Sequence, residues 1–85
     1  MKHPIDIKGF DTMKELATDI GNLEYETLQE FLKELGAKIN DDAERDESAG
    51  KHVLAGELYN LGEMINDIAD SLEGTIEICK PYQDA

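Results

Sequence analysis

The chain has 85 residues, 40% of them hydrophobic, and its 20 acidic against 8 basic side chains give a net charge of −12. This length allows one domain with a thin core, and the charge disfavours binding to nucleic-acid phosphates or anionic membranes. A single cysteine, Cys79, excludes an intrachain disulfide, and because no apolar run resembles a membrane span or signal peptide, the cytoplasm is the expected compartment.

The negative charge is concentrated in the body of the chain. Residues 15–77 contain 17 acids and 4 bases, whereas residues 1–14 and 78–85 together contain 3 acids and 4 bases. A body of this kind attracts basic protein surfaces over a distance that shrinks as salt rises. Phe10, Tyr25, Phe31, Tyr59 and Tyr82 are the only aromatic residues, so the core is expected to be aliphatic.

A short arm and a short helix are predicted at the start of the chain. Residues 1–11 alternate apolar and polar side chains between a proline and a glycine, a pattern typical of an extended arm. A helix is expected over residues 12–20, because Thr12 and Glu15 form a capping-box pair and Gly21 follows as a stop. Its apolar residues fall on one face: Met13, Leu16 and Ile20.

A long helix is predicted over residues 23–46. Asn22 is a candidate N-cap, and Glu24 and Glu26 in the first turn favour the positive end of the helix dipole. The apolar seam of this helix consists of Leu28, Leu32, Leu35 and Ile39. Gly36 offers the alternative of a break after Leu35.

A second long helix is predicted over residues 51–73, fraying to about Lys80. Apolar residues recur there at steps of three and four, the spacing of a core-facing helix whose neighbour lies nearly along it: Leu54, Leu58, Leu61, Ile65, Ile68 and Leu72. Gly74 offers a stop, and Pro81 is expected to end any extension. The connection between the long helices is predicted at residues 47–50, short enough to make them antiparallel neighbours.

A matched stripe of small residues predicts the register of the two long helices. If the chain folds back about Ala49, residues whose numbers sum to 98 face each other: Ala43 and Ala55, Gly36 and Gly62, Gln29 and Ala69. Each glycine inside a helix costs about 1 kcal/mol relative to alanine. A close approach of the two backbones is a reason to accept that cost, so the first long helix is expected to continue through Gly36.

Polar residues near the connection form a candidate small-ligand site. Asp42 and Asp46 occupy seam positions where Leu or Ile is expected, and a polar residue there can fix register. The acid spacing does not fit a calcium loop, and no His or Cys ligand set is present. A ligand site with residues recruited from elsewhere in the chain would consist of Lys8, Lys14, Asp42, Arg45, Asp46, Lys51 and His52.

Residues 12–35 resemble a helix-turn-helix in part. The Ala17–Gly21 spacing fits this motif, but Leu23 falls one place late. The helix that would enter the DNA groove carries Glu24, Glu26, Gln29, Glu30, Lys33 and Glu34. Carboxylates in a groove flanked by phosphates oppose binding, so two helices joined by a Gly-Asn turn are the simpler interpretation.

The outer face of the last helix is the best candidate surface for a protein partner. It carries Asn60, Glu63, Asp67, Asp70 and Glu77. Charges at this spacing usually form a solvated face, but so little positive charge balances them that a docking stripe for a basic partner is the functional alternative. No nucleophile accompanies either histidine, and no phosphate loop, Cys-x-x-Cys or His-Glu-x-x-His motif is present. The sequence therefore predicts neither an enzyme nor a cofactor or metal site.

Together these patterns predict a single all-α domain over residues 1–85. Its architecture is an antiparallel helical hairpin with a short N-terminal helix, and dimerisation is expected to complete a helical bundle. The leading functional hypothesis is a non-catalytic acidic adaptor or inhibitor that docks on a basic protein. The alternatives are a protein that binds or sequesters a small ligand such as a nucleotide signal, as a phage or mobile-element counter-defence factor would, and a helix-turn-helix DNA-binding regulator.

Overall fold

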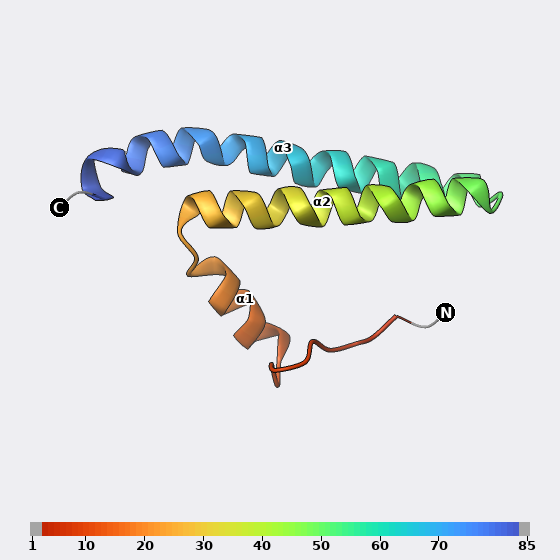
Figure 1. Ribbon diagram of the computed structural model, residues 1–85, viewed down its shortest axis with the longest axis horizontal. Helices are drawn as coiled ribbons and strands as arrows, with labels where there is room; N and C mark the ends of the chain where they lie inside the picture. Colours follow the sequence, from red (N-terminus) through yellow and green to blue (C-terminus); the bar gives the residue numbers. More distant parts are fainter. Residues whose placement is uncertain (1–2, 84–85) are drawn as a thin grey trace.

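The computed structural model describes residues 3–83, and these form three α-helices and no strand (Figure 1). Helix α1 spans Met13–Gly21, α2 spans Tyr25–Ser48 and α3 spans His52–Gln83. The all-α class is confirmed. The end of α3 differs from the expected range, because the helix continues past residue 73 and past the fraying end expected at about Lys80, to Gln83.

Helix α1 is capped as the sequence predicts at its start and differently at its end. Thr12 is the N-cap, and its hydroxyl accepts a hydrogen bond of 3.1 Å from the backbone N–H of Glu15. Asn22, expected to cap α2, is instead the C-cap of α1, where its N–H donates to the carbonyls of Thr18 and Ile20. Glu24 takes the N-cap position of α2 without a side-chain hydrogen bond.

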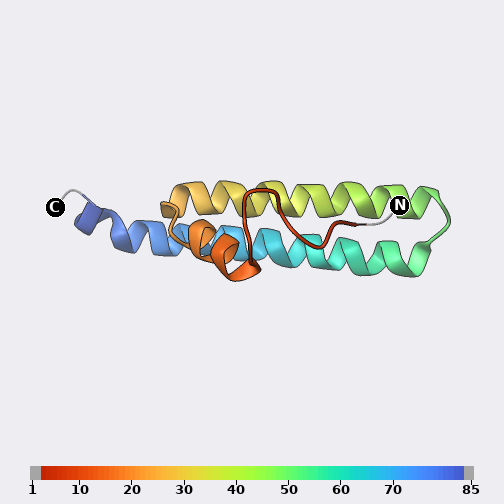
Figure 2. The ribbon, with the colours of Figure 1, turned by 90° about the horizontal axis from the view of Figure 1, so that it is seen from below.

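Helices α2 and α3 form the antiparallel hairpin, and they are the pair that packs extensively (Figures 1 and 2). The connection is shorter than expected, because α2 continues to Ser48. Gly50 has a φ of +82°, in the left-handed region that favours glycine. The Lys51 N–H donates to the Asp46 carbonyl across the turn at 2.8 Å.

The register between α2 and α3 is the one that the small-residue stripe predicts. A Cβ placed on Gly36 would lie 3.3 Å from the Gly62 carbonyl oxygen, and a Cβ on Gly62 would lie 3.3 Å from the Gly36 carbonyl oxygen. The Gln29 amide Nε2 donates to the Ala69 carbonyl at 2.9 Å. Helix α2 therefore runs unbroken through Gly36, because the two backbones meet there.

The residues between the two helices are small. Ala43, Ala55 and Ala69 are completely buried, and both glycines of the stripe are buried too. Among the described residues no large side chain is fully buried. The close contact thus aligns the helices but leaves their larger hydrophobic side chains only partly covered.

The extension of α3 follows from packing beyond Gly74. Ile76 is 6% exposed and Cys79 is half-buried, so the helix gains contacts after the glycine. Pro81 does not end the helix as expected but lies inside its last turn, where its missing N–H affects little of the helix. Over the described residues, no helix combines the length and apolar character needed to cross a membrane.

The N-terminal part of the chain stands apart from the hairpin. In Figure 1, α1 points away from α2 at a steep angle, and no residue of α1 is buried. The arm before it bends at Gly9, which has a φ of +95°, and the Phe10 N–H donates to the Ile7 carbonyl at 3.1 Å. From there the arm runs back on the side of the hairpin where α1 lies (Figures 1 and 2), and His3 lines a cavity together with residues of α2 and α3.

Candidate functional site

The hairpin has two distinct faces, one on each side of the contact between α2 and α3. On one side Asp42 and Asp46 of α2 line a common cavity with Leu54 and Leu58 of α3. Residues seven apart on a helix share a face, so both apolar seams lie on this side. We call it the apolar face, and it consists of Leu28, Leu32, Leu35, Ile39, Leu54, Leu58, Leu61, Ile65, Ile68 and Leu72.

The opposite side carries the acids. The Nζ atom of Lys33 in α2 lies 3.9 Å from Oδ1 of Asp70 in α3. This ion pair shows on which side of the hairpin the charged positions of both helices lie. By helical spacing, the neighbours of these two residues lie on the same side. We call this the acidic face, and it consists of Glu26, Glu30, Glu34, Asp41, Glu44, Asn60, Glu63, Asp67, Asp70 and Glu77, all exposed.

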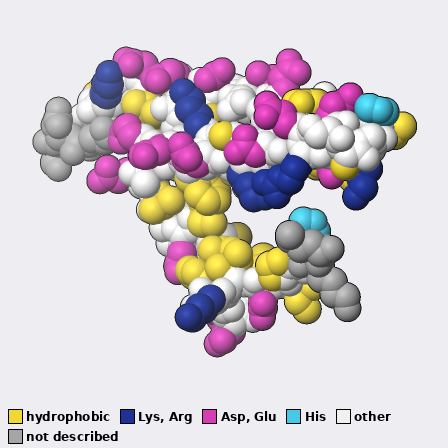
Figure 3. Space-filling view, turned by 45° about the vertical axis from the view of Figure 1, so that its right-hand side comes forward, with side chains coloured by type: hydrophobic (Ala, Val, Ile, Leu, Met, Phe, Trp, Pro, Cys, Tyr) yellow, Lys and Arg dark blue, Asp and Glu magenta, His cyan; other side chains and the backbone are white. Residues whose placement is uncertain are grey.

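Few cations offset the acidic face. Asp70 is the partner of Lys33, and Glu77 accepts a hydrogen bond of 2.9 Å from Lys80, which raises the pKa of that lysine above its usual range. Within residues 3–83, Glu63 and Asp67 take part in no ion pair. Figure 3 shows acidic side chains spread over the hairpin. The five predicted partner-binding residues are thus exposed on one side, and two of the four acids among them, Glu63 and Asp67, have no ion-pair partner within the described residues.

At the connection end, the apolar face gives way to a polar cavity of about 390 Å³. Four of the seven predicted ligand residues line it together: Asp42, Arg45, Asp46 and Lys51. Its remaining lining is His3, Leu54 and Leu58. Because the lining combines two acids with two permanent cations, the cavity itself is close to neutral and differs from the acidic face.

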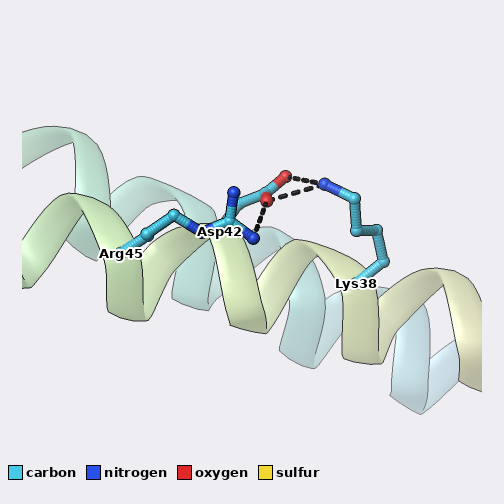
Figure 4. A network of polar contacts seen from close by, with 3 residues as sticks. All are labelled: Lys38, Asp42 and Arg45. Carbon is cyan, nitrogen blue, oxygen red and sulfur yellow. Dashed lines mark hydrogen bonds and ion pairs between the residues drawn. The ribbon is translucent and has the colours of Figure 1, made fainter.

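Asp42 is the centre of the polar network in this region (Figure 4). Lys38, one turn earlier, donates to both Asp42 carboxylate oxygens at 2.6 Å, and an Arg45 guanidinium nitrogen lies 3.7 Å from Oδ1. The hydrogen bond from Lys38 lowers the pKa of Asp42, and the charges of Lys38, Arg45 and His3 act in the same direction. Two of these cations are therefore already engaged by Asp42.

The other three predicted ligand residues lie elsewhere. Lys8 is on the exposed arm, and Lys14 borders a separate shallow hollow on α1. His52 is the first residue of α3, and its Nδ1 lies 2.7 Å from Oε1 of Glu47. His3 was not expected in the site, because nothing in the sequence indicates that the arm returns to the hairpin.

Three further features of the described residues concern metal binding, a serine hydroxyl and DNA reading. They contain no group of three His, Cys, Asp or Glu side chains placed to hold a metal ion. The Ser71 hydroxyl donates to the Asp67 carbonyl at 2.9 Å, a bond within its own helix. The glutamates at the start of α2 are exposed, and the helix thus presents carboxylates where DNA reading requires donors to bases and phosphates.

No protein-family model matches the chain, and neither a curated protein nor a solved structure shows significant similarity to it. Its function is inferred from the faces of the hairpin alone.

Proposed function

We propose that this protein is a non-catalytic interaction module whose acidic face docks on a basic protein surface, as an adaptor or inhibitor. One observation carries the proposal: nine of the twelve exposed acids of the two long helices lie on one side of the hairpin, and Glu63 and Asp67 have no ion-pair partner within the described residues. Such a surface attracts cationic partners at long range and accelerates their association.

The close contact between the two long helices supports docking by a whole face. The backbones of α2 and α3 are in contact at Gly36 and Gly62, so the acids stand on one continuous two-helix layer. Charges held on helices keep their spacing when a partner arrives, which lowers the ordering cost of binding. The proposed partner therefore presents lysines or arginines along an elongated surface.

Dimerisation belongs to the same proposal. The hairpin buries only small side chains completely, and a domain of this size normally needs a third element or a second chain to complete its core. A homodimer that covers the apolar faces leaves the acidic faces free for the partner.

The test is capture from the native host on immobilised protein, with mass spectrometry of the retained proteins. A variant with Glu63→Gln, Asp67→Asn and Asp70→Asn should lose basic proteins that the parent retains, and the loss should resemble the effect of raising salt. A control with Asp6→Asn, Asp11→Asn and Glu15→Gln changes the net charge equally but lies outside the hairpin. If both variants retain the same proteins as the parent, the acidic face is not the docking surface.

A second candidate function is supported by the polar cavity, where Asp42, Arg45, Asp46 and Lys51 converge. A small ligand with anionic and donor groups, such as a nucleotide, fits the charges present. Isothermal titration with a nucleotide panel tests it, and Arg45→Ala should abolish any binding observed. Saturable binding of duplex DNA in a fluorescence-anisotropy titration at physiological salt would instead favour a DNA-binding regulator.

A further inference from the structure

The N-terminal arm carries two isoleucines that are largely exposed. Ile5 is 94% exposed and Ile7 is 47% exposed. His3, two residues before Ile5, lines the polar cavity of the hairpin. Side chains two residues apart in an extended segment point to the same side. An extended arm that keeps His3 at the cavity therefore turns both isoleucines toward the hairpin, and Asp6 and Lys8 toward solvent.

The apolar face lies on the side of the hairpin where the arm runs. Figures 1 and 2 together show the arm running along the hairpin on the side where α1 lies. His3 shares its cavity with Leu58, and the next member of the apolar face along α3 is Leu61, which is 45% exposed. Both the arm and α3 lead from the connection end of the hairpin toward the other end, so their side chains can pair in chain order.

The spacing of the isoleucines matches that of the apolar face. Leu61 and Ile65 are four residues apart on α3, which corresponds to about 6 Å at the helical rise per residue. Ile5 and Ile7 are two residues apart, which corresponds to about 7 Å along an extended chain. An arm that closes on α3 can therefore place one isoleucine on each of these two members. Since His3 lies at the connection end, Ile5 is the one nearer to Leu61.

Few contacts hold the arm and α1 away from the hairpin. Among the described residues α2 and α3 are the pair that packs extensively, and no residue of α1 is buried. Gly9, between the arm and α1, has a φ of +95°, and glycine changes its backbone conformation more easily than other residues. Closing the arm therefore breaks little packing, and it buries isoleucine and leucine side chains that are now exposed.

The chain connection favours the arm over a separate molecule. A segment that the same chain carries to a surface is present there at an effective concentration on the order of millimolar, whereas a second copy is present only at its solution concentration. The arm also fits the polarity of the surface, because its isoleucines meet apolar side chains while His3 stays at the polar end beside Asp42 and Asp46. Both features select the arm as the segment that covers this part of the apolar face.

We propose that residues 3–7 form a strap that closes on the apolar face of the same chain, with Ile5 on Leu61 and Ile7 toward Ile65. The closed strap covers part of the surface through which the proposed homodimer forms, so opening of the strap controls self-association. This control rests on the proposed homodimer, whereas the closure itself does not.

A disulfide between the strap and α3 tests the closure. In a Cys79→Ser background, Ile5→Cys with Leu61→Cys should form a disulfide within one chain under mild oxidation, at a rate that does not change on dilution. The non-reduced protein should keep the 9.5 kDa mass of one chain. Ile5→Cys with Asn60→Cys, on the acidic face, is the matched control and should not form this bond. Disulfides only between copies, or a control that closes as readily, overturn the proposal.

The same variant separates the strap from the homodimer. Sedimentation equilibrium of the oxidised Ile5→Cys, Leu61→Cys protein should give the mass of one chain, and reduction should restore the mass of two at the same concentration. An oxidised protein that is still dimeric overturns the control of self-association. A reduced protein that stays a single chain contradicts the homodimer, while the disulfide within the chain supports the strap.

The unmodified protein offers a second measurement if the cysteine variants fail to fold. In dilute solution, nuclear Overhauser contacts are expected between the methyl groups of Ile5 and Leu61. Ile78, which is 71% exposed on α3, is the control, and its methyl groups should show no contact with the strap. Spectra in which Ile5 contacts no residue of the hairpin overturn the proposal.

Discussion

The two faces of the hairpin are made by the same two helices and differ in what each requires. The acidic face carries exposed charges of which Glu63 and Asp67 are in no ion pair among the described residues, whereas the apolar face leaves Leu54, Leu61 and Ile68 about half exposed. Between them lies a contact of glycine and alanine. Two helices that contact each other through such small residues cannot bury their large side chains between them. We therefore propose that one side of the hairpin serves stability and the other recognition.

The largest expected effect comes from truncating a side chain of the apolar face. Ile65 is half-buried at the edge of the helix contact, and Ile65→Ala should lower the free energy of unfolding by about 2–4 kcal/mol if a second copy completes its burial. Ile78→Ala, at a position 71% exposed, is the control and should change stability by less than ~0.5 kcal/mol. Thermal melts at several protein concentrations measure both, and equal small effects would mean that the apolar face is not covered.

The next effect concerns the contact between the faces. Gly62→Leu should cost about 1–3 kcal/mol by overpacking, because its Cβ would clash with the Asn40 amide oxygen and approach the Gly36 carbonyl. Gly56→Leu is the matched control, since a Cβ there meets no atom within 4 Å; it should stabilise the helix slightly. Chemical denaturation compares the two variants. A Gly62→Leu protein as stable as the parent would contradict the close approach.

The acidic face should contribute little to folding. Replacing Glu63, Asp67 and Asp70 by their amides should change stability by less than ~0.5 kcal/mol per site, because single exposed charges are worth little. The same variant should associate more slowly with a basic partner, since steering is screened over only about 8 Å at physiological salt. Stopped-flow association rates and thermal melts separate the two effects. A large loss of stability would place these acids in a structural role.

The smallest effect is a pH dependence at the polar end of the apolar face. The hydrogen bond from Lys38 lowers the pKa of Asp42 from 3.8, so the carboxylate stabilises the fold above that pH, and this contribution is lost as pH falls through the lowered value. Asp42→Asn should therefore flatten the acid side of the Tm-against-pH profile. Lys38→Met should flatten the profile similarly. An unchanged profile in both variants would show that the network around Asp42 does not contribute to the stability of the fold.

Local patterns in the sequence determined the helices, the Thr12 cap and the register of the hairpin. The hydrophobic periodicity and the seven-residue spacing of small residues can be read within each helix. They allow one alignment of the two helices, and the contacts of Gly36 with Gly62 and of Gln29 with Ala69 show that alignment. The face that carries each candidate site was also implicit in that spacing. The partner and ligand roles of these residues stay predictions.

Only the tertiary structure decided which distant residues meet. Asn22 is the C-cap of α1 and not the N-cap of α2. Helix α2 begins two residues later than the capping preference of Asn22 predicts, with Glu24 as its N-cap. Helix α3 passes Gly74 and Pro81, since burial of Ile76 outweighs the local preference to stop. His3 joins Asp42 and Lys51 at the cavity while Lys8 and Lys14 stay away. The place of His3 depends on how the arm is oriented, and that orientation is set by contacts between segments that no local pattern encodes.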